Sequence, residues 1–217
     1  MDDILISAAD PEFARFQRRV ISDTRYPILG VRMPILRRLA KQATREEMPL
    51  EYFEQVLLKG LSIAYTKTSM EEKLAKLRKF LPEMDSWAMT DSIVPTLQPK
   101  PEELSALWDF AVECIAGEGE YTVRFGIVIL LNHFLTETYI PQVADQLCTI
   151  QDDRYYIRMA VSWCFAEMAV TDYERVEAIL RSGCLDLFVH NKTIQKMRES
   201  YRITKEQKAA VWLLRRK

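Results

Sequence analysis

Glycine and histidine are scarce in this sequence, which has six glycines and two histidines among 217 residues. Few segments show the β-branched alternation of strands, so the chain is expected to be helical. His133 and His190 lie far apart and neither has a second ligand at metal spacing, so no metal site is predicted. His133, within LLNHFL, is interpreted as a helix-packing residue. GxxxxGK[ST] and GxSxG are absent, which leaves a P-loop site and a Ser-His-Asp hydrolase without support.

Long apolar runs are also missing from the sequence. No stretch approaches the roughly 18 apolar residues that cross a bilayer, and no basic segment near the N-terminus leads into a continuous apolar run. We therefore expect a cytoplasmic protein that makes no membrane contact. The four cysteines, Cys114, Cys148, Cys164 and Cys184, form no CxxC pair and have apolar neighbours, so they are expected to be buried free thiols.

The net charge of −1 hides an uneven distribution of charge along the chain. Residues 13–45 carry nine Lys or Arg and one acid, Asp23, and residues 192–217 carry nine Lys or Arg and two acids. Both ends are therefore basic, and the middle is acidic. Two basic segments suit a polyanion such as DNA if the fold brings them to one surface, whereas two solvated helix faces are the alternative.

Helix start signals recur along the chain. They stand at Asp10 with Pro11, at Pro34, at Ser69, at Pro101, and at Thr204 with Gln207, which has capping-box spacing. These signals predict about a dozen helices of roughly 8 to 16 residues, joined by short turns, and no strand.

The C-terminal half of the sequence is organised as pairs of helices. Three pairs of helices are predicted, each of roughly 30 to 40 residues. The two helices of a pair are separated at residues 117–119 in the first pair, near Asp152 in the second and at Gly183 in the third. This spacing is typical of an α-solenoid of the HEAT type. The predicted fold is therefore all-α, with about six antiparallel helix pairs in one domain over residues 1–217, curved around a concave basic groove. The pairs share a pattern but no sequence, so an irregular helical bundle is the alternative.

The segment SWAMTDSIVP, residues 86–95, places an acid beside an aromatic ring. Trp87 and Asp91 are four residues apart, so in a helix they lie on one face about one turn apart. Met89, Ile93 and Leu97 form a second face that is suited to packing. An acid on a helix is often a solvated charge or the partner of an arginine, but here it stands next to an indole.

Two apolar runs contain an arginine. In EYTVRFGIVILLNHFL the guanidinium of Arg124 must meet an anion or leave the core, for example by snorkelling outward or by pairing with a glutamate. In YYIRMAVSWCFAEMAV, Arg158 and Trp163 are five residues apart, so they project from different sides of the helix. A tryptophan in such a run is commonly a core residue.

A carboxylate, two indoles and an arginine between basic segments fit one particular reaction. A purine alkylated at N3 or N7 is a cation with a weakened glycosidic bond, and indole faces attract cations. As the bond breaks, positive charge builds on the sugar, and a nearby carboxylate stabilises that oxocarbenium ion or orients the attacking water. An arginine would hold the phosphates that flank the lesion.

The chain resembles the AlkD-like DNA glycosylases of the DNA alkylation repair family, which are built of HEAT repeats. Four segments carry the resemblance: YPILGVRMPILRRLAK at 26–41, SWAMTDSIVPT at 86–96, YTVRFGIVIL at 121–130 and YYIRMAVSW at 155–163. The resemblance covers residues from about 26 to 197, and DSIVPT is its most specific part. It implies excision of cationic alkylpurines from duplex DNA, with the damaged base left in the stack and with no metal or organic cofactor. We expect a monomer.

The resemblance also implies roles for individual residues. Asp91 is expected to be the catalytic carboxylate, Trp87 and Trp163 the aromatic residues at the lesion, and Arg124 a ligand of the DNA backbone. Further backbone contacts are expected from Arg158, Lys192, Lys196 and Arg202.

The chain departs from the family pattern at two places. Ser86 stands where the best-known members have a further aromatic residue, and Phe165 or Ala166 replaces a basic residue. The family also contains members that look like DNA-structure binders without excision activity. A non-catalytic DNA-binding HEAT-repeat protein is therefore the first alternative, and a scaffold for protein partners is the second.

Overall fold

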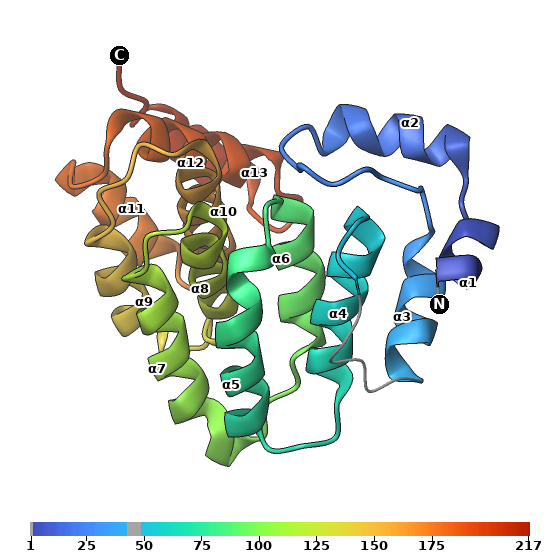
Figure 1. The fold of residues 1–217 in the computed structure, drawn as a ribbon. Helices are drawn as coiled ribbons and strands as arrows, with labels where there is room; N and C mark the ends of the chain where they lie inside the picture. The colour runs from blue at the N-terminus through green and yellow to red at the C-terminus, as the bar shows by residue number, and fades with distance from the viewer. Residues whose placement is uncertain (1, 43–48) are drawn as a thin grey trace. The chain divides into compact units, whose positions relative to one another are not determined.

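The computed structural model describes residues 2–42 and 49–217, and every regular element within them is helical (Figure 1). This part of the chain forms thirteen α-helices and three 3₁₀ turns and contains no strand, which confirms the all-α prediction. Arg45, which was counted with the basic N-terminal segment, lies outside the described residues. The chain divides into two compact units, here called unit 1 (residues 1–110) and unit 2 (residues 111–217).

Unit 1 is built around one buried helix. Its elements are α1 (Asp2–Ser7), α2 (Pro11–Val20), α3 (Met33–Lys41), α4 (Phe53–Tyr65), α5 (Met70–Phe80), η1 (Leu81–Glu83), α6 (Trp87–Ile93), η2 (Val94–Thr96), η3 (Pro101–Glu103) and the first half of α7 (Leu104–Ile115). α4 packs against α3, α5 and α6. Ten of its thirteen residues are buried, so apolar side chains occur around most of the helix.

Two contacts of α4 fix the neighbouring segments of unit 1. A Cβ added at Gly60 would lie 2.2 Å from Ile93 Cδ1, so glycine is what allows α4 and α6 to approach so closely. The fully buried carboxylate of Glu54 accepts hydrogen bonds from the backbone N–H groups of Leu29, Gly30 and Val31, at 3.0, 2.7 and 3.2 Å. Because those N–H groups belong to the loop before α3, Glu54 holds that loop against α4.

Unit 2 has the same plan around α10. Its elements are the rest of α7, α8 (Glu120–His133), α9 (Ile140–Cys148), α10 (Tyr155–Thr171), α11 (Tyr173–Ser182), α12 (Leu187–Glu199) and α13 (Lys205–Trp212). α10 packs against α8, α9, α11 and α12, and α12 packs against α13. The loop before α10 is tied to the α7–α8 turn, since Arg154 donates to the Glu118 carbonyl and Glu120 Oε1 accepts from Tyr156 N at 2.9 Å.

Most of the predicted helix boundaries are confirmed. Asp10 caps α2 by accepting from Glu12 N and Phe13 N, and Ser69 caps α5 by accepting from Glu72 N. The breaks near Asp152 and at Gly183, whose φ is 73°, fall between helices as predicted. Pro101 opens a 3₁₀ turn before α7 instead of the α-helix itself. The six-residue α1 was not predicted, because it has neither a capping residue nor a full apolar period.

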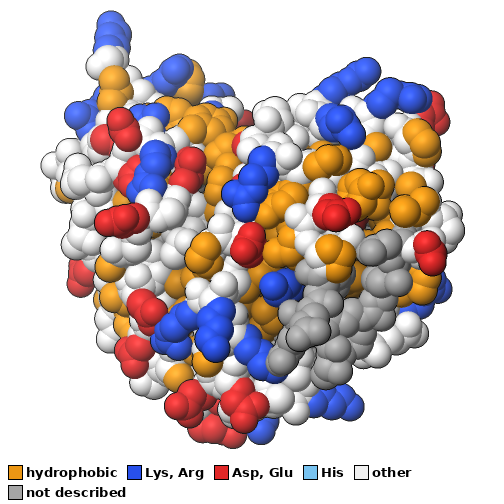
Figure 2. All heavy atoms as spheres, viewed as in Figure 1, with side chains coloured by type: hydrophobic (Ala, Val, Ile, Leu, Met, Phe, Trp, Pro, Cys, Tyr) orange, Lys and Arg blue, Asp and Glu red, His pale blue; other side chains and the backbone are white. Residues whose placement is uncertain are grey.

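The surface of unit 1 carries apolar side chains near the N-terminus. Ile4, Ile6, Phe16 and Val20 are all exposed, and apolar side chains are visible over α1 to α3 in Figure 2. No helix among residues 2–42 and 49–217 combines the length and the apolar character needed to cross a bilayer.

The prediction of four buried thiols is correct for two cysteines and wrong for the other two. Cys114 and Cys164 are buried, but Cys148 is half-buried and Cys184 is exposed. Cys184 follows Gly183 in the turn between α11 and α12, where the chain reverses at the surface of unit 2. Apolar neighbours in the sequence therefore did not predict burial in a turn.

Candidate functional site

The predicted acid and indole of unit 1 lie on one short helix, α6. Trp87 is its first residue and Asp91 follows one turn later, and both side chains are half-buried. Met89, Ile93 and Leu97 are buried, as predicted for the packing face. The helix therefore presents Trp87 and Asp91 together at its partly accessible side.

The start of α6 is anchored to a segment about sixty residues earlier in the chain. Asp85 accepts from Thr24 Oγ1 at 2.8 Å and from the backbone N–H of Arg25 at 2.7 Å. Asp23 Oδ2 accepts from the backbone N–H of Trp87 at 3.4 Å. These contacts fix the position of Trp87, and no sequence pattern indicated them because the partners are remote in the chain.

The carboxylate of Asp91 lies beside the hydroxyl of Thr90. Thr90 Oγ1 is 2.9 Å from Asp91 Oδ1 and 2.8 Å from the Trp87 carbonyl oxygen, so its single proton is donated to one of them at a time. Thr90 itself is fully buried. A buried hydroxyl thus limits the rotation of the half-buried acid.

Unit 1 also fixes a guanidinium next to this helix. Arg37 of α3 donates through Nη1 to Tyr65 Oη and to Thr96 Oγ1, both at 3.0 Å, and its Nη2 lies 3.5 Å from the carbonyl oxygen of Ser92. Lys41, one turn later on α3, lies 5.0 Å from the centre of the Tyr65 ring. Sequence reasoning counted both residues only as charge, although they fall within the segment 26–41 that carried the resemblance.

Arg124 of unit 2 remains in the interior. Its side chain is only 5% exposed, and Nη1 donates to the Tyr156 carbonyl oxygen at 2.9 Å. Of the sequence expectations, outward snorkelling is therefore wrong. The contact joins the middle of α8 to the first turn of α10. The Tyr156 carbonyl oxygen has two lone pairs, so it can accept this hydrogen bond in addition to one from within α10.

Trp163 forms part of a chain of polar contacts at the middle of α10. Its indole Nε1 donates to Glu167 Oε1 at 3.4 Å, and Glu167 forms a salt bridge with Arg202, in the connection between α12 and α13. Trp163 is half-buried, so it is not the enclosed core residue that its apolar run suggests. Arg202, predicted as a DNA contact, is therefore already paired with an acid.

The remaining predicted cations of unit 2 gather on and beside α12. Burial is the main cause that lowers the pKa of Lys196; the positive charges of Lys192 and Arg124 lower it further, while Glu199 and Glu167 raise it. Arg158 of α10 lies over the Phe188 ring, with 4.6 Å between the guanidinium carbon and the ring centre. Unit 2 thus brings Arg124, Lys192 and Lys196 near one another, together with Glu199 and Glu167.

No cluster of metal-ligating side chains occurs in the described part of the chain. Across residues 2–42 and 49–217, no three His, Cys, Asp or Glu side chains lie close enough to share a metal ion. His190 is buried, and its Nε2 lies 2.8 Å from the Leu214 carbonyl oxygen, to which it donates. That histidine therefore fastens the C-terminal segment to α12.

Taken together, the helices and side chains define an all-α protein in which each unit presents a tryptophan with a carboxylate, and in which unit 2 also gathers cations on and beside α12. The model of one protein family matches residues 1–203, and its description is DNA alkylation repair enzyme. The chain belongs to this family, and it is accordingly an enzyme of DNA repair with DNA as its substrate. Comparisons with curated proteins and with solved structures give no match.

Proposed function

We propose that the protein hydrolyses the N-glycosidic bond of purines alkylated at N3 or N7 in duplex DNA, without a metal ion and without flipping the base. One observation carries the proposal. Asp91 and Trp87 share the accessible side of α6, and the acid is steadied by the buried hydroxyl of Thr90. Family membership gives DNA as the substrate, and this pair offers a chemistry that suits a cationic lesion.

The reaction follows from the charges involved. An alkylated purine is positively charged, and the face of the Trp87 indole attracts it. The bond between C1′ and the purine nitrogen breaks, its electron pair neutralises the purine, and positive charge appears on the sugar. The Asp91 carboxylate stabilises that charge. Water then bonds to C1′ and gives up a proton, which leaves a free alkylpurine and an abasic site.

Unit 2 supplies the remaining parts of the proposal. Trp163 is the second lesion-site aromatic residue, and phosphates are bound by Arg124, Arg158, Lys192, Lys196 and Arg202. Of these, Lys192 has no acid partner in the described part of unit 2, whereas Arg202 has to compete with Glu167 for any phosphate. The proposal extends to HEAT-like stacking of the helix pairs, a concave basic groove, a single domain over residues 1–217 and a cytoplasmic monomer.

The test is release of free base from methylated duplex DNA, measured under single turnover. The wild-type protein is expected to release N7-methylguanine or N3-methyladenine. Asp91→Asn keeps the size and the neighbours of the side chain but removes its charge, so release should fall by about 100-fold or more. Affinity for undamaged duplex should change little, because Asp91 makes no phosphate contact in the proposal. Equal release by the two proteins would end the proposal.

A non-catalytic DNA-binding protein is the second candidate, and one observation favours it. Several arginines and lysines of unit 2 form no salt bridge in the described part of the chain, a property that serves binding whether or not a bond is cleaved. This alternative predicts tight, salt-sensitive binding of duplex DNA and no free base, with wild type and Asp91→Asn alike.

A further inference from the structure

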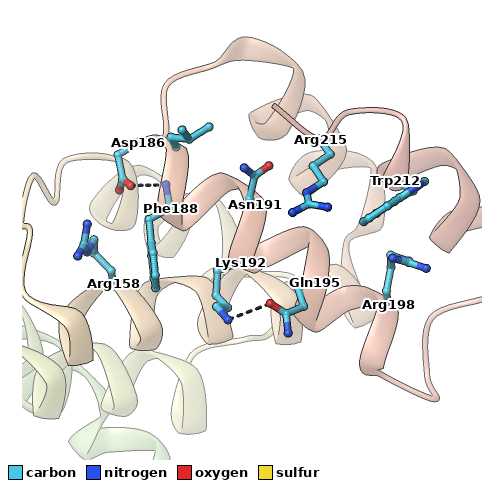
Figure 3. A pocket seen from close by; sticks show the side chains of 10 residues that line it. Arg158, Asp186, Phe188, Asn191, Lys192, Gln195, Arg198, Trp212 and Arg215 are labelled. Atoms are coloured by element: carbon cyan, nitrogen blue, oxygen red, sulfur yellow. Dashed lines mark hydrogen bonds between the residues drawn. The ribbon is translucent and has the colours of Figure 1, made fainter. Parts of the chain in front are cut away.

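An open pocket of about 640 Å³ lies on unit 2 between the start of α10, α12 and the C-terminal segment (Figure 3). Four of its lining side chains are cations, two are aromatic and one is an acid. The cations are Arg158, Lys192, Arg198 and Arg215, the aromatic residues are Phe188 and Trp212, and the acid is Asp186. Arg198, Arg215 and both rings have no role in the function proposed above.

Every cation of this pocket lies near an aromatic ring. The guanidinium carbon of Arg198 is 4.0 Å from the centre of the Trp212 ring, and that of Arg215 is 5.0 Å from it. Arg158 and Lys192 lie 4.6 and 5.9 Å from the centre of the Phe188 ring. The rings therefore hold the cations in place without neutralising them, since cation–π attraction leaves the full charge available to a ligand.

These four cations also lack acid partners. Within residues 2–42 and 49–217, none of them forms a salt bridge, and the Nε of Arg158 is buried without a hydrogen-bond partner. Asp186 uses its carboxylate to cap α12, accepting from Phe188 N at 2.8 Å and from Val189 N at 3.1 Å. Elsewhere in unit 2 several surface arginines are paired: Arg154 with Asp152, Arg175 with Asp172, and Arg181 with Glu177.

The C-terminal side of the pocket is held by backbone contacts. His190 binds the Leu214 carbonyl at 2.8 Å, and Asn191 exchanges two hydrogen bonds with the backbone of Arg216, at 2.9 and 3.0 Å. Arg215 lies between these two anchored residues. The backbone of Arg215 is therefore fixed before any ligand arrives, which reduces the entropy lost on binding.

We propose that this pocket binds phosphate groups of a DNA strand, with Arg198 and Arg215 as contacts in addition to Arg158 and Lys192. The proposal rests on the proposed function for the choice of DNA as the polyanion. Four like charges that form no salt bridge within the described residues and share one pocket with a single acid, Asp186, repel one another, and a bound phosphodiester relieves that repulsion. The pocket is open, as a continuous strand requires, and it contains two of the cations that the sequence already indicated as phosphate ligands.

The experiment measures the affinity of a fluorescent undamaged duplex between about 50 and 200 mM salt. The Arg198→Gln and Arg215→Gln variants should each reduce the slope of log Kd against log salt concentration by about 1, and the double variant by about 2. The matched control is Arg181→Gln, which removes an arginine that is paired with Glu177 and should leave the slope unchanged. A second pair, Arg198→Lys and Arg215→Lys, keeps the charge and should keep the slope.

Each outcome supports or overturns the proposed phosphate site independently of the glycosylase proposal. Unchanged slopes in properly folded glutamine variants overturn it, and so does an equal loss in Arg181→Gln. A nucleoside triphosphate that binds the wild type and loses affinity in the glutamine variants, while duplex affinity stays the same, would show that the pocket serves a free nucleotide instead. If no base is released from methylated DNA but the slopes fall as expected, the glycosylase proposal fails and the pocket stands.

An independent observation concerns two cysteines of unit 2. Cys148 ends α9 and Cys184 lies in the turn before α12, and their Sγ atoms are 3.7 Å apart. We propose that this pair is oxidised to a disulfide by hydroperoxides. The exposed Cys184 thiolate attacks the peroxide oxygen and becomes a sulfenic acid as the O–O bond breaks. Cys148 sulfur then attacks that sulfur, and water leaves with the Cys148 proton.

The order of attack follows from the environments of the two thiols. Burial, together with the neighbouring Cys184, raises the pKa of Cys148 to about 12, so Cys148 is the poorer first nucleophile. Net oxidation consumes one hydrogen peroxide and two thiols and yields two waters and one disulfide. The protein should become two hydrogens lighter in intact mass.

The test treats the folded protein with hydrogen peroxide and maps the product by non-reducing peptide mass spectrometry. A Cys148–Cys184 disulfide is expected, and Cys148→Ser should instead stop at sulfenic or sulfinic acid on Cys184. The buried Cys114 and Cys164 are internal controls that should remain reduced. A product with both thiols of the pair intact, or with Cys184 over-oxidised in the wild type, would refute the disulfide.

Discussion

Each unit carries a tryptophan and an acid four residues apart on one helix, yet the two acids have different surroundings. In unit 1, Asp91 lies beside the neighbouring Thr90 hydroxyl. In unit 2, Glu167 receives a hydrogen bond from the Trp163 indole and a salt bridge from Arg202, which is remote in the sequence. The same spacing therefore places one acid beside a hydroxyl that neighbours it in the chain and the other acid beside an arginine that is remote in the sequence.

Both units also anchor their loops through charged side chains. Unit 1 uses carboxylates that accept from backbone N–H groups, as Glu54 and Asp85 do. Unit 2 does so through Glu120, and it also uses guanidinium groups that donate to carbonyl oxygens, as those of Arg124, Arg154 and Arg216 do. A protonated carboxyl group keeps only part of its accepting capacity, whereas arginine keeps all its donors at any physiological pH.

The largest effect on base release is expected when each of the two acids is replaced by its uncharged amide. Asp91→Asn should lower the rate of base release by about 100-fold or more. Glu167→Gln should lower it by less than about 10-fold, because the new amide oxygen still accepts from the Trp163 indole. Single-turnover release from methylated duplex measures both. If Glu167→Gln were the more damaging change, the roles given to the two units would be reversed.

A large effect on stability is expected at Glu54, which holds the loop before α3 against α4. Glu54→Gln replaces one carboxylate oxygen by an NH₂ group that faces backbone N–H donors, so the free energy of unfolding should fall by about 2 to 4 kcal/mol. Urea unfolding followed by circular dichroism measures this change. The exposed Glu51→Gln is the control and should shift stability by less than about 0.5 kcal/mol. If Glu54→Gln had the same urea unfolding midpoint as the wild type, the anchoring role of this carboxylate would be contradicted.

The two indoles should matter about equally if both attract the cationic base. Trp87→Leu and Trp163→Leu each remove a cation–π partner, and each should slow release of a cationic base by roughly 3- to 30-fold. As a control for the quality of the duplex, an unrelated enzyme that releases uracil from duplex DNA is assayed in the same mixture. A loss confined to Trp87→Leu would mean that the tryptophan of unit 2 has only a structural role.

The smallest effect concerns pH. Burial lowers the pKa of Lys196 below its ordinary value, so Lys196 loses its proton at a lower pH than a surface lysine. A phosphate favours the charged form, so duplex affinity should decline as pH rises through that lowered pKa. Lys196→Arg stays charged and should show a flatter pH profile, measured as Kd at constant salt. Identical profiles would exclude a phosphate contact by Lys196.

Much of the helical organisation was predictable because its causes are local. Asp10, Ser69 and Thr204 act on N–H groups within three residues, and Gly183 ends α11 through its own backbone conformation. The shared face of Trp87 and Asp91 is likewise a consequence of helix periodicity alone. For the same reason, the buried face of Met89, Ile93 and Leu97 was predicted correctly.

The contacts that give these residues their chemical setting were not predictable from local pattern. The sequence alone determined the helices, the family resemblance and the spacing of each tryptophan from its acid. Only the tertiary structure decided that Arg202 pairs with Glu167, that Arg124 stays buried, that Asp85 holds Thr24, and that Arg198 and Arg215 share the Trp212 ring. Helix periodicity is set by neighbours in the chain, whereas the partner of a charge is set by whichever distant segment packs against it.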